Sequence, residues 1–177
     1  MATESALFSY SLRLADNANV LGHRMCEWSG KAPMLEEDLA LSNLGLDLIG
    51  QARSLYAYAA EVEGQGRTED DLAFLRDANK YSNVLLVEIP NGDFAVTMLR
   101  HFFFAAYYAP FFAELAKSKD ETLAAVAAKA VREMDYHLRH SAEWVIRLGD
   151  GTDESAKRMQ DAVKVLWSYT GELFERD

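Results

Sequence analysis

Five side chains in the helix-patterned stretches of this 177-residue chain are candidates for chemistry: Glu27, Asp47, Arg100, Glu133 and His137. Carboxylates and imidazoles of this kind suit iron or manganese as metal ligands. In a helical bundle, a di-iron site takes one Glu from each of two helices and a Glu-x-x-His motif from each of the other two. The spacing of three places the carboxylate and the imidazole on one helix face, about a turn apart.

The first two helical stretches supply carboxylates, and the second lacks the imidazole that the Glu-x-x-His motif requires. Asn19, His23 and Glu27 form a polar stripe at a spacing of four, which we interpret as a solvated or interface face, although His23 or Glu27 could reach inward. Asp47 lies in the segment LSNLGLDLIGQAR, and the residue three positions later is Gly50 rather than His. The second stretch therefore has a carboxylate whose imidazole partner is missing.

The other two helical stretches depart further from the template. Residues 94–113 contain no Asp or Glu, and Arg100 occupies the middle of that run. A permanent cation repels a metal ion where an anionic ligand is required. In VREMDYHLRH, Tyr136 stands three residues after Glu133, and His137 comes one residue later, turned by about 100° around the helix. Two of the six ligand types of the template are therefore absent, and a third is displaced.

These departures predict no catalytic residue, no metal ligand and no bound cofactor in this chain. Glu27, Asp47, Arg100, Glu133 and His137 become candidates for a vestigial or polar core. A buried charge needs a partner, so an inward Arg100 should lie beside Asp47 or Glu133. Alternatively, Glu133 and His137 are an ordinary pair one turn apart. A divergent di-metal oxygenase using Glu27, Asp47, Glu133 and His137 is the enzyme alternative, and a self-associating helical scaffold is the third reading.

The elements that position these residues are predicted from hydrophobic periodicity. Apolar residues at spacings of three and four line one face of each long segment, as in amphipathic helices. A shorter helix is expected from Asp70 to about Asn79, and residues 81–90 are expected to be a helix or an ordered connection. The predicted long helices cover residues 5–28, 36–63, 94–118, 121–148 and 153–174.

Local signals place the ends of these helices and one irregularity. Asp93, Asp120, and Thr152 or Asp153 stand where an N-cap belongs. Pro110 should kink its helix, because proline removes a backbone hydrogen bond and clashes with the preceding turn. The surrounding aromatic run, HFFFAAYYAPFF, covers nearly every side of that helix, which indicates burial in the core and at a subunit interface.

Long helices of about 36–42 Å predict an all-α fold. Their number and length favour a ferritin-like antiparallel four-helix bundle with extra short helices, because the second and third long helices are joined by a long crossover. No repeat, charge run or Ser/Pro tract marks a boundary. Residues 1–177 are therefore predicted to form a single ferritin-like helical domain.

Composition excludes several classes of function. The 18 basic and 28 acidic residues give a net charge of −10, which argues against binding nucleic acid or an anionic membrane. The single Cys26 cannot form an intramolecular disulfide, and neither a secretory signal nor a membrane-spanning segment is visible. We therefore expect a cytoplasmic protein. Phosphate-binding, dinucleotide-binding and nucleophile-elbow motifs are absent from the sequence.

With these residues in view, the chain resembles the C-subunit family of bacterial phenylacetyl-CoA 1,2-epoxidases, multicomponent oxygenases of phenylacetate degradation. The resemblance covers nearly the whole chain in order, and VEIPNGDFA and GLDLIGQAR are its most specific segments. The other matching segments are LGHRMCEWSG, LEEDLALSNLGLDLIGQAR, RDANKYSNVLLVEIPNGDFAVTMLRHFF, EMDYHLRHSAEWVIRLGDGTDES and MQDAVKVLW.

The resemblance implies a ferritin-like fold and a place in aerobic aromatic degradation. It implies a non-catalytic structural subunit that pairs with a catalytic A subunit, in a homo- or hetero-oligomer. In that family the A subunit holds the di-iron centre and the CoA-ester substrate, and electrons come from NADPH through a reductase. Family members continue beyond Phe174 with a further helical stretch, so this chain is expected to lack the C-terminal extension.

Overall fold

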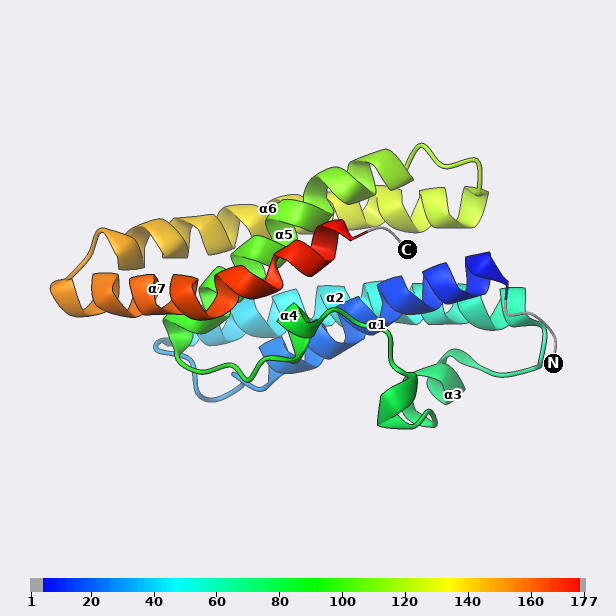
Figure 1. Cartoon of the computed structure of the whole chain (residues 1–177), viewed down its shortest axis with the longest axis horizontal. Helices are drawn as coiled ribbons and strands as arrows, with labels where there is room; N and C mark the ends of the chain where they lie inside the picture. Colours follow the sequence, from blue (N-terminus) through cyan, green and yellow to red (C-terminus); the bar gives the residue numbers. More distant parts are fainter. Residues whose placement is uncertain (1–4, 176–177) are drawn as a thin grey trace. The chain divides into compact units, whose positions relative to one another are not determined.

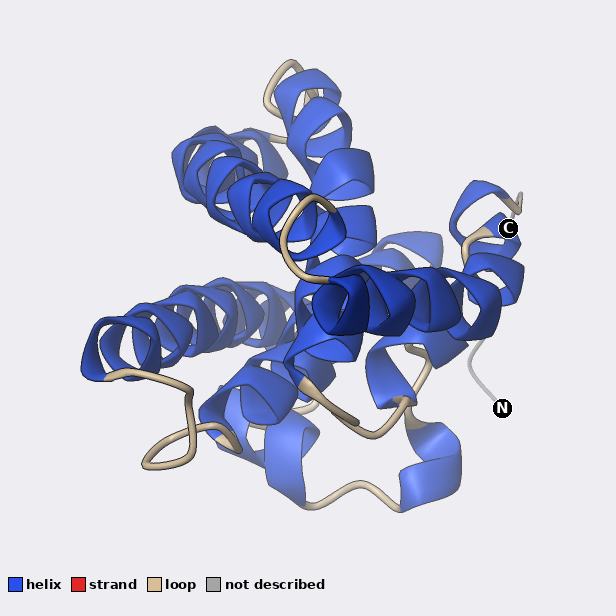
Figure 2. Cartoon of the chain, turned by 90° about the vertical axis from the view of Figure 1, so that its left-hand side faces the viewer, coloured by secondary structure: helices blue, strands red, loops and turns tan. Residues whose placement is uncertain are grey.

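The computed structural model describes residues 5–175, and every regular element in this range is a helix (Figures 1 and 2). The predicted all-α class is therefore confirmed. By their internal contacts the residues fall into two compact units, one within Met1–Asn83 and one within Val84–Asp177. The single-domain expectation for residues 1–177 stays a prediction.

The first unit is built on a hairpin of two long helices. Helix α1 spans Ala6–Cys26 and helix α2 spans Leu35–Glu63, and the two lie side by side (Figure 1). The Ser5 side chain caps α1 by accepting a 3.1 Å hydrogen bond from the backbone N–H of Phe8. Helix α2 ends at Gly64, whose φ of 67° is readily adopted only by a residue without a side chain.

Two glycines allow these helices to approach closely. A Cβ atom on Gly45 would lie 2.6 Å from Sγ of Cys26 and 3.1 Å from the carbonyl oxygen of Gly22. A Cβ atom on Gly22 would meet the Gly45 carbonyl oxygen at 3.2 Å. Gly50, also within α2, has no heavy atom within 4 Å of the corresponding position. The crossing of α1 and α2 therefore depends on the absence of side chains at two positions facing each other.

The connection after α2 is ordered by short helices. Helix α3 spans Glu69–Phe74, and the 3-10 turn η1 spans Ala78–Lys80. Thr68 and Asp71 form a capping box at the start of α3, each side chain accepting from the other residue's backbone N–H. The short helix predicted over residues 70–79 is present but ends at Phe74, because the chain leaves helical geometry there, just before Arg76 contacts α1 and α2.

The second unit packs two long helices and a third, shorter one. Helices α5 (Phe94–Leu115) and α6 (Glu121–Gly149) lie side by side, and α7 (Asp153–Leu166) packs on both (Figure 1). The ring of Phe94 meets the ring of Trp144 edge-on at 5.0 Å, which joins the start of α5 to α6. The elements are α4 Leu85–Glu88, α5 Phe94–Leu115, α6 Glu121–Gly149, α7 Asp153–Leu166, η2 Trp167–Tyr169 and η3 Gly171–Phe174.

The helix ends in this unit mostly follow the sequence signals. Asp93, Asp120 and Thr152 each accept a hydrogen bond from the N–H three residues on, as N-caps do. The short α4 agrees with the expected helix or connection over residues 81–90. Helix α5 continues through Pro110 to Leu115. The fifth predicted helix is too long, since α7 ends at Leu166 and the chain continues in the 3-10 turns η2 and η3.

The described helices also bear on membrane insertion. Among residues 5–175, no helix combines the length and the apolar character needed to cross a bilayer.

Candidate functional site

Arg100 points into the protein, as expected if it belongs to a polar core. Its side chain is fully buried in α5, and its guanidinium donates to the backbone carbonyl of Ile89 and to Oδ1 of Asn91. Both acceptors come from the segment between α4 and α5, so the cation ties that segment to the middle of the helix. The expected contact of Arg100 with Asp47 or Glu133 stays a prediction.

Next to Arg100, two histidines meet between α5 and α6. His101 and His137 are fully buried, and their ring centroids lie 5.0 Å apart. Within residues 5–175 neither ring nitrogen of His101 has a hydrogen-bond partner. Burial lowers the pKa of His101 well below its usual value, and the nearby His137, Arg100 and His140 lower that pKa further. His101 is therefore held neutral.

The predicted carboxylates occupy different surroundings. Glu27 is the C-cap of α1 and is exposed, with Oε1 2.8 Å from Nη1 of Arg24. Asp47 is half-buried on α2. Glu133 is half-buried on α6, with Oε1 3.4 Å from Nζ of Lys129 one turn before it. Two of the three carboxylates thus lie beside a cation of their own helix.

The donor set does not match what a di-metal centre requires. The described part of the chain, residues 5–175, contains no group of three or more His, Cys, Asp or Glu side chains that could hold a metal ion. Arg100, a permanent cation, is buried on α5. Gly50 and Tyr136 stand where the template needs imidazoles. The residues present therefore do not fit a di-iron group, and no step through such a group is derived for this chain.

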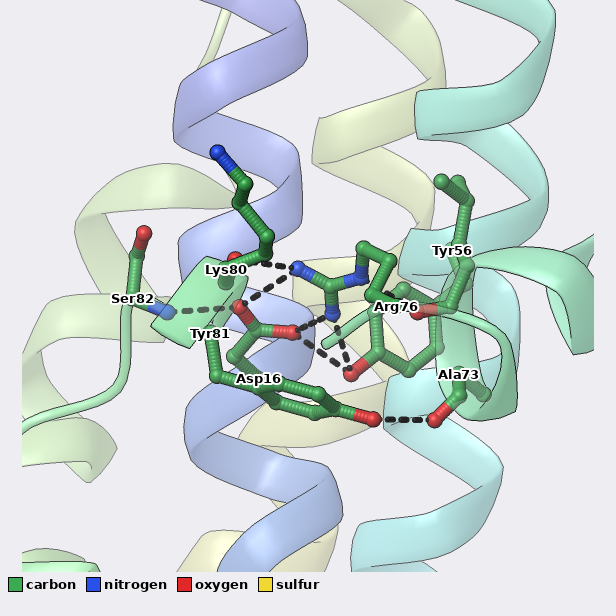
Figure 3. Close-up of polar contacts among 8 residues, drawn as sticks. Asp16, Tyr56, Ala73, Arg76, Lys80, Tyr81 and Ser82 are labelled. Carbon is green, nitrogen blue, oxygen red and sulfur yellow. Dashed lines mark hydrogen bonds and ion pairs between the residues drawn. The ribbon is translucent and has the colours of Figure 1, made fainter. Parts of the chain in front are cut away.

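The first unit contains a buried ionic network centred on Asp16 (Figure 3). The Asp16 carboxylate is fully buried in α1 and forms an ion pair with the guanidinium of Arg76. It also accepts a 2.6 Å hydrogen bond from the Tyr56 hydroxyl and a 2.8 Å bond from the backbone N–H of Ser82. Burial and the adjacent Asp16 carboxylate raise the pKa of Tyr56 above its usual value, so its hydroxyl remains a donor.

Arg76 connects this carboxylate to the segment that follows α3. Its Nη1 donates to the carbonyl of Lys80 at 2.8 Å, and its Nε donates to the carbonyl of Leu72 at 2.5 Å. The guanidinium also lies 4.3 Å from the centre of the Tyr81 ring, a cation–π contact. The Tyr81 hydroxyl in turn donates to the carbonyl of Ala73. The network therefore fastens residues 72–82 onto the hairpin of α1 and α2.

Sequence reasoning missed this network. The only local signal was a carboxylate on the apolar side of α1, where Leu12 and Leu14 precede Asp16. Its partner Arg76 stands 60 residues away, and nothing in the spacing of either residue connects the two. A buried charge is rarely left unpaired, so the signal predicts that a cation comes from elsewhere without saying which one.

In the second unit, an open apolar groove of about 560 Å³ runs along α5. In the aromatic run, Phe104, Tyr108 and Phe112 are buried, whereas Phe103, Tyr107 and Phe111 line the groove. The interface role predicted for this run stays a prediction. The groove is lined on one side by Phe103, Ala106, Tyr107, Pro110, Phe111 and Glu114, and on the other by Trp167, Thr170, Leu173 and Phe174.

Comparison with known proteins gives concordant results. The family model described as "Phenylacetic acid catabolic protein" matches residues 1–177. A curated protein of Escherichia coli (strain K12), the C subunit of 1,2-phenylacetyl-CoA epoxidase, is 54% identical to this chain over 171 residues. The alignment covers 97% of this chain and 68% of that relative. The resemblance drawn from the sequence segments is therefore confirmed.

Proposed function

Since this chain belongs to the phenylacetic acid catabolic protein family, we propose that it is a non-catalytic structural subunit of a phenylacetyl-CoA 1,2-epoxidase. In this proposal it pairs with a catalytic A subunit, which holds the di-iron centre and binds the CoA ester. The proposal also includes a ferritin-like four-helix bundle formed by α1, α2, α5 and α6. The side-by-side pairs α1–α2 and α5–α6 and the long crossover support that bundle.

The observation that carries the non-catalytic role is the buried guanidinium of Arg100. A metal-binding bundle needs anionic ligands in the middle of its helices, whereas here α5 has a permanent cation fixed by Ile89 and Asn91. His101, the next residue, is held neutral beside His137. These buried side chains therefore serve the packing of the protein interior in this proposal, and the oxygenase reaction is assigned to the A subunit.

Co-expression with an A-type subunit of the same family tests the pairing. We expect the two chains to co-purify and to elute together in size-exclusion chromatography. Phenylacetyl-CoA epoxidation, measured with NADPH and the reductase, should depend on both chains. Epoxidation by this chain without the A-type subunit would contradict the proposal.

Iron analysis tests the assignment of the metal. After aerobic reconstitution with ferrous iron, the A-type subunit should retain iron through desalting, while this chain alone should retain none in stoichiometric amount. A pair of irons per copy of this chain would contradict the proposal and favour the divergent di-metal oxygenase that uses Glu27, Asp47, Glu133 and His137.

A further inference from the structure

The outward face of α2 carries a short heptad pattern. Six positions along this face alternate spacings of four and three residues, as the a and d positions of a coiled coil do. All six are exposed or half-buried, whereas other residues of α2 pack on α1. A heptad face left open on the outside of a helix is suited to pairing with another helix. We call these positions the α2 seam: Leu39, Asn43, Leu46, Gly50, Arg53 and Ala57.

The leucines of the seam are open to water and stand beside open space. Leu39 is 59% exposed and Leu46 is 63% exposed, and Leu35, one turn before Leu39, is 70% exposed. A single exposed leucine is ordinary, but a row of them on one helix face marks an interaction surface. One turn after Leu46, Gly50 has no heavy atom within 4 Å of its Cβ position. The seam therefore presents projecting side chains followed by a gap.

These projections and gaps fit each other when two copies of α2 run antiparallel. In a twofold pair every contact is formed twice, once from each copy. Once Leu46 faces Gly50 of the second copy, the same register places Leu39 opposite Ala57. Both leucines of the seam then meet a small residue, which is how ridges and grooves of packed helices fit together. The pattern of large and small residues is therefore self-complementary.

A hollow lies where this register delivers the exposed leucines. An open pocket of about 430 Å³ is formed between the end of α2 and the start of α3, and Ala57 and Gly64 are among its lining residues. Leu39 of the second copy arrives opposite Ala57 and brings Leu35 to the same hollow. By symmetry, the leucines of the first copy enter the equivalent hollow of the second. The size pattern of the seam and the position of the pocket thus point to the same arrangement.

Charge selects the antiparallel direction. The Arg53 side chain is 76% exposed. In the antiparallel register its guanidinium meets the side-chain amide of Asn43 of the second copy, and the Asp47 carboxylate stands one turn beyond that amide. Parallel pairing in register would instead place Arg53 against Arg53 and would leave a void between two copies of Gly50.

We propose that two copies of this chain associate through the α2 seam as an antiparallel, twofold-symmetric dimer. The second copy is the occupant because the same helix supplies the leucines, the small residues opposite them and the hollow. The seam from Leu39 to Ala57 is about 27 Å long, which is shorter than a standard interface requires. We therefore expect a reversible dimer with a dissociation constant of about 1–100 μM. This inference does not depend on the A-type subunit.

Sedimentation equilibrium of the chain alone measures the dimer. Gly50→Leu should weaken dimerisation by about tenfold or more, because the new side chain meets Leu46 of the second copy. The monomer tolerates this change, since the Cβ position of Gly50 faces open space. Leu46→Ala/Gly50→Leu should regain affinity, because a large residue again faces a small one. Leu75→Ala is the control, since Leu75 is 77% exposed outside the seam, and it should dimerise as the wild type does.

Cysteine cross-linking tests the register. The Cys26→Ser background removes the single native cysteine. A mixture of Leu39→Cys and Ala57→Cys chains should form disulfide-linked mixed dimers on mild oxidation, because the two positions face each other. Neither variant should cross-link with itself, since two copies of position 39 lie about 27 Å apart in this register.

The outcomes separate this inference from the proposed function. A wild-type chain that stays monomeric up to about 1 mM overturns the dimer. A dimer that Gly50→Leu does not weaken, or in which each cysteine variant cross-links with itself, also overturns it. If Gly50→Leu reduces only the binding of an A-type subunit, the seam serves that partner, and this inference fails while the proposed function stands. Circular dichroism should show the same helicity in all variants.

Discussion

At the scale of single residues, buried ionisable side chains are either paired with an opposite charge or kept in their neutral form. Asp16 in the first unit is paired with Arg76 and surrounded by further donors. His101 in the second unit is kept uncharged by burial and by the nearby His137, Arg100 and His140. The two arrangements respond differently to mutation and to pH, and each gives a testable consequence.

Removal of the Asp16 charge should destabilise the protein strongly. In Asp16→Asn, the buried guanidinium of Arg76 loses its counter-ion, which typically costs about 3–5 kcal/mol of unfolding free energy. The control is Glu27→Gln, which removes an exposed ion pair with Arg24 and should change the unfolding free energy by less than about 1 kcal/mol. Urea denaturation followed by circular dichroism measures both. Equal effects of the two substitutions would contradict a structural role for the network.

His101 should make the protein less stable in mild acid. Its pKa is lower in the folded state than in the unfolded chain, so the unfolded chain binds the proton first as the pH falls below about 6.5. The free energy of unfolding is therefore unaffected by His101 above that pH. Below it, the free energy of unfolding falls by up to about 1.4 kcal/mol per pH unit.

The variant His101→Phe tests this pH dependence. It should flatten the fall in unfolding free energy between about pH 5 and pH 6.5. His23→Gln, which replaces an exposed histidine, serves as the control for the loss of a histidine as such. Parallel slopes for the wild type and His101→Phe would show that another group determines the acid sensitivity.

At the scale of helices, the crossing of α1 and α2 depends on two glycines. In Gly45→Ala, the new methyl group meets Sγ of Cys26 and the Gly22 backbone, and overpacking of this kind costs about 1–3 kcal/mol. Gly50→Ala, in the same helix with open space at its Cβ position, should instead stabilise the protein by about 0.5–1 kcal/mol. Thermal unfolding of the two variants should therefore shift in opposite directions. A stabilised Gly45→Ala would mean that the helices are not in close contact there.

The helices were predictable to the extent that their determinants are local. Asp93, Asp120 and Thr152 start helices where the sequence indicates, because an N-cap needs only its own side chain and the next turn. The end of α7 at Leu166 was not predicted, since the residues that follow continue the apolar pattern in tighter 3-10 turns. The break after Phe74 follows from the contacts of Arg76 with distant residues, which periodicity does not encode.

The candidate site shows the same division between local and distant determinants. The displaced His137 and the cation at Arg100 could be recognised from spacing alone, and the inward position of Arg100 agrees with one alternative. Its hydrogen bonds to Ile89 and Asn91 could not be foreseen, because they depend on how the segment before α5 folds back. The groove combines a helix with turns more than fifty residues later, and no motif marks that combination.

At the scale of the whole molecule, the unfolding behaviour tests the single-domain prediction. Two compact units are distinguished by their internal contacts, and the segment that joins them, KYSNVLLVEI, has no Gly, Ser-rich or Pro-rich character of a flexible linker. We therefore expect one cooperative transition in differential scanning calorimetry, with equal calorimetric and van't Hoff enthalpies. Two separated transitions would show that the units unfold independently and would contradict the prediction.

The position of the Asp16 network along the chain has a consequence for biosynthesis. Every described partner of that carboxylate lies at or before Ser82. Domains emerging from the ribosome generally fold from the N-terminus onward. The most costly buried charge of the first unit can thus be neutralised while the second half of the polypeptide is still being translated. A nascent chain arrested shortly after residue 83 has left the exit tunnel should already protect this region from proteases.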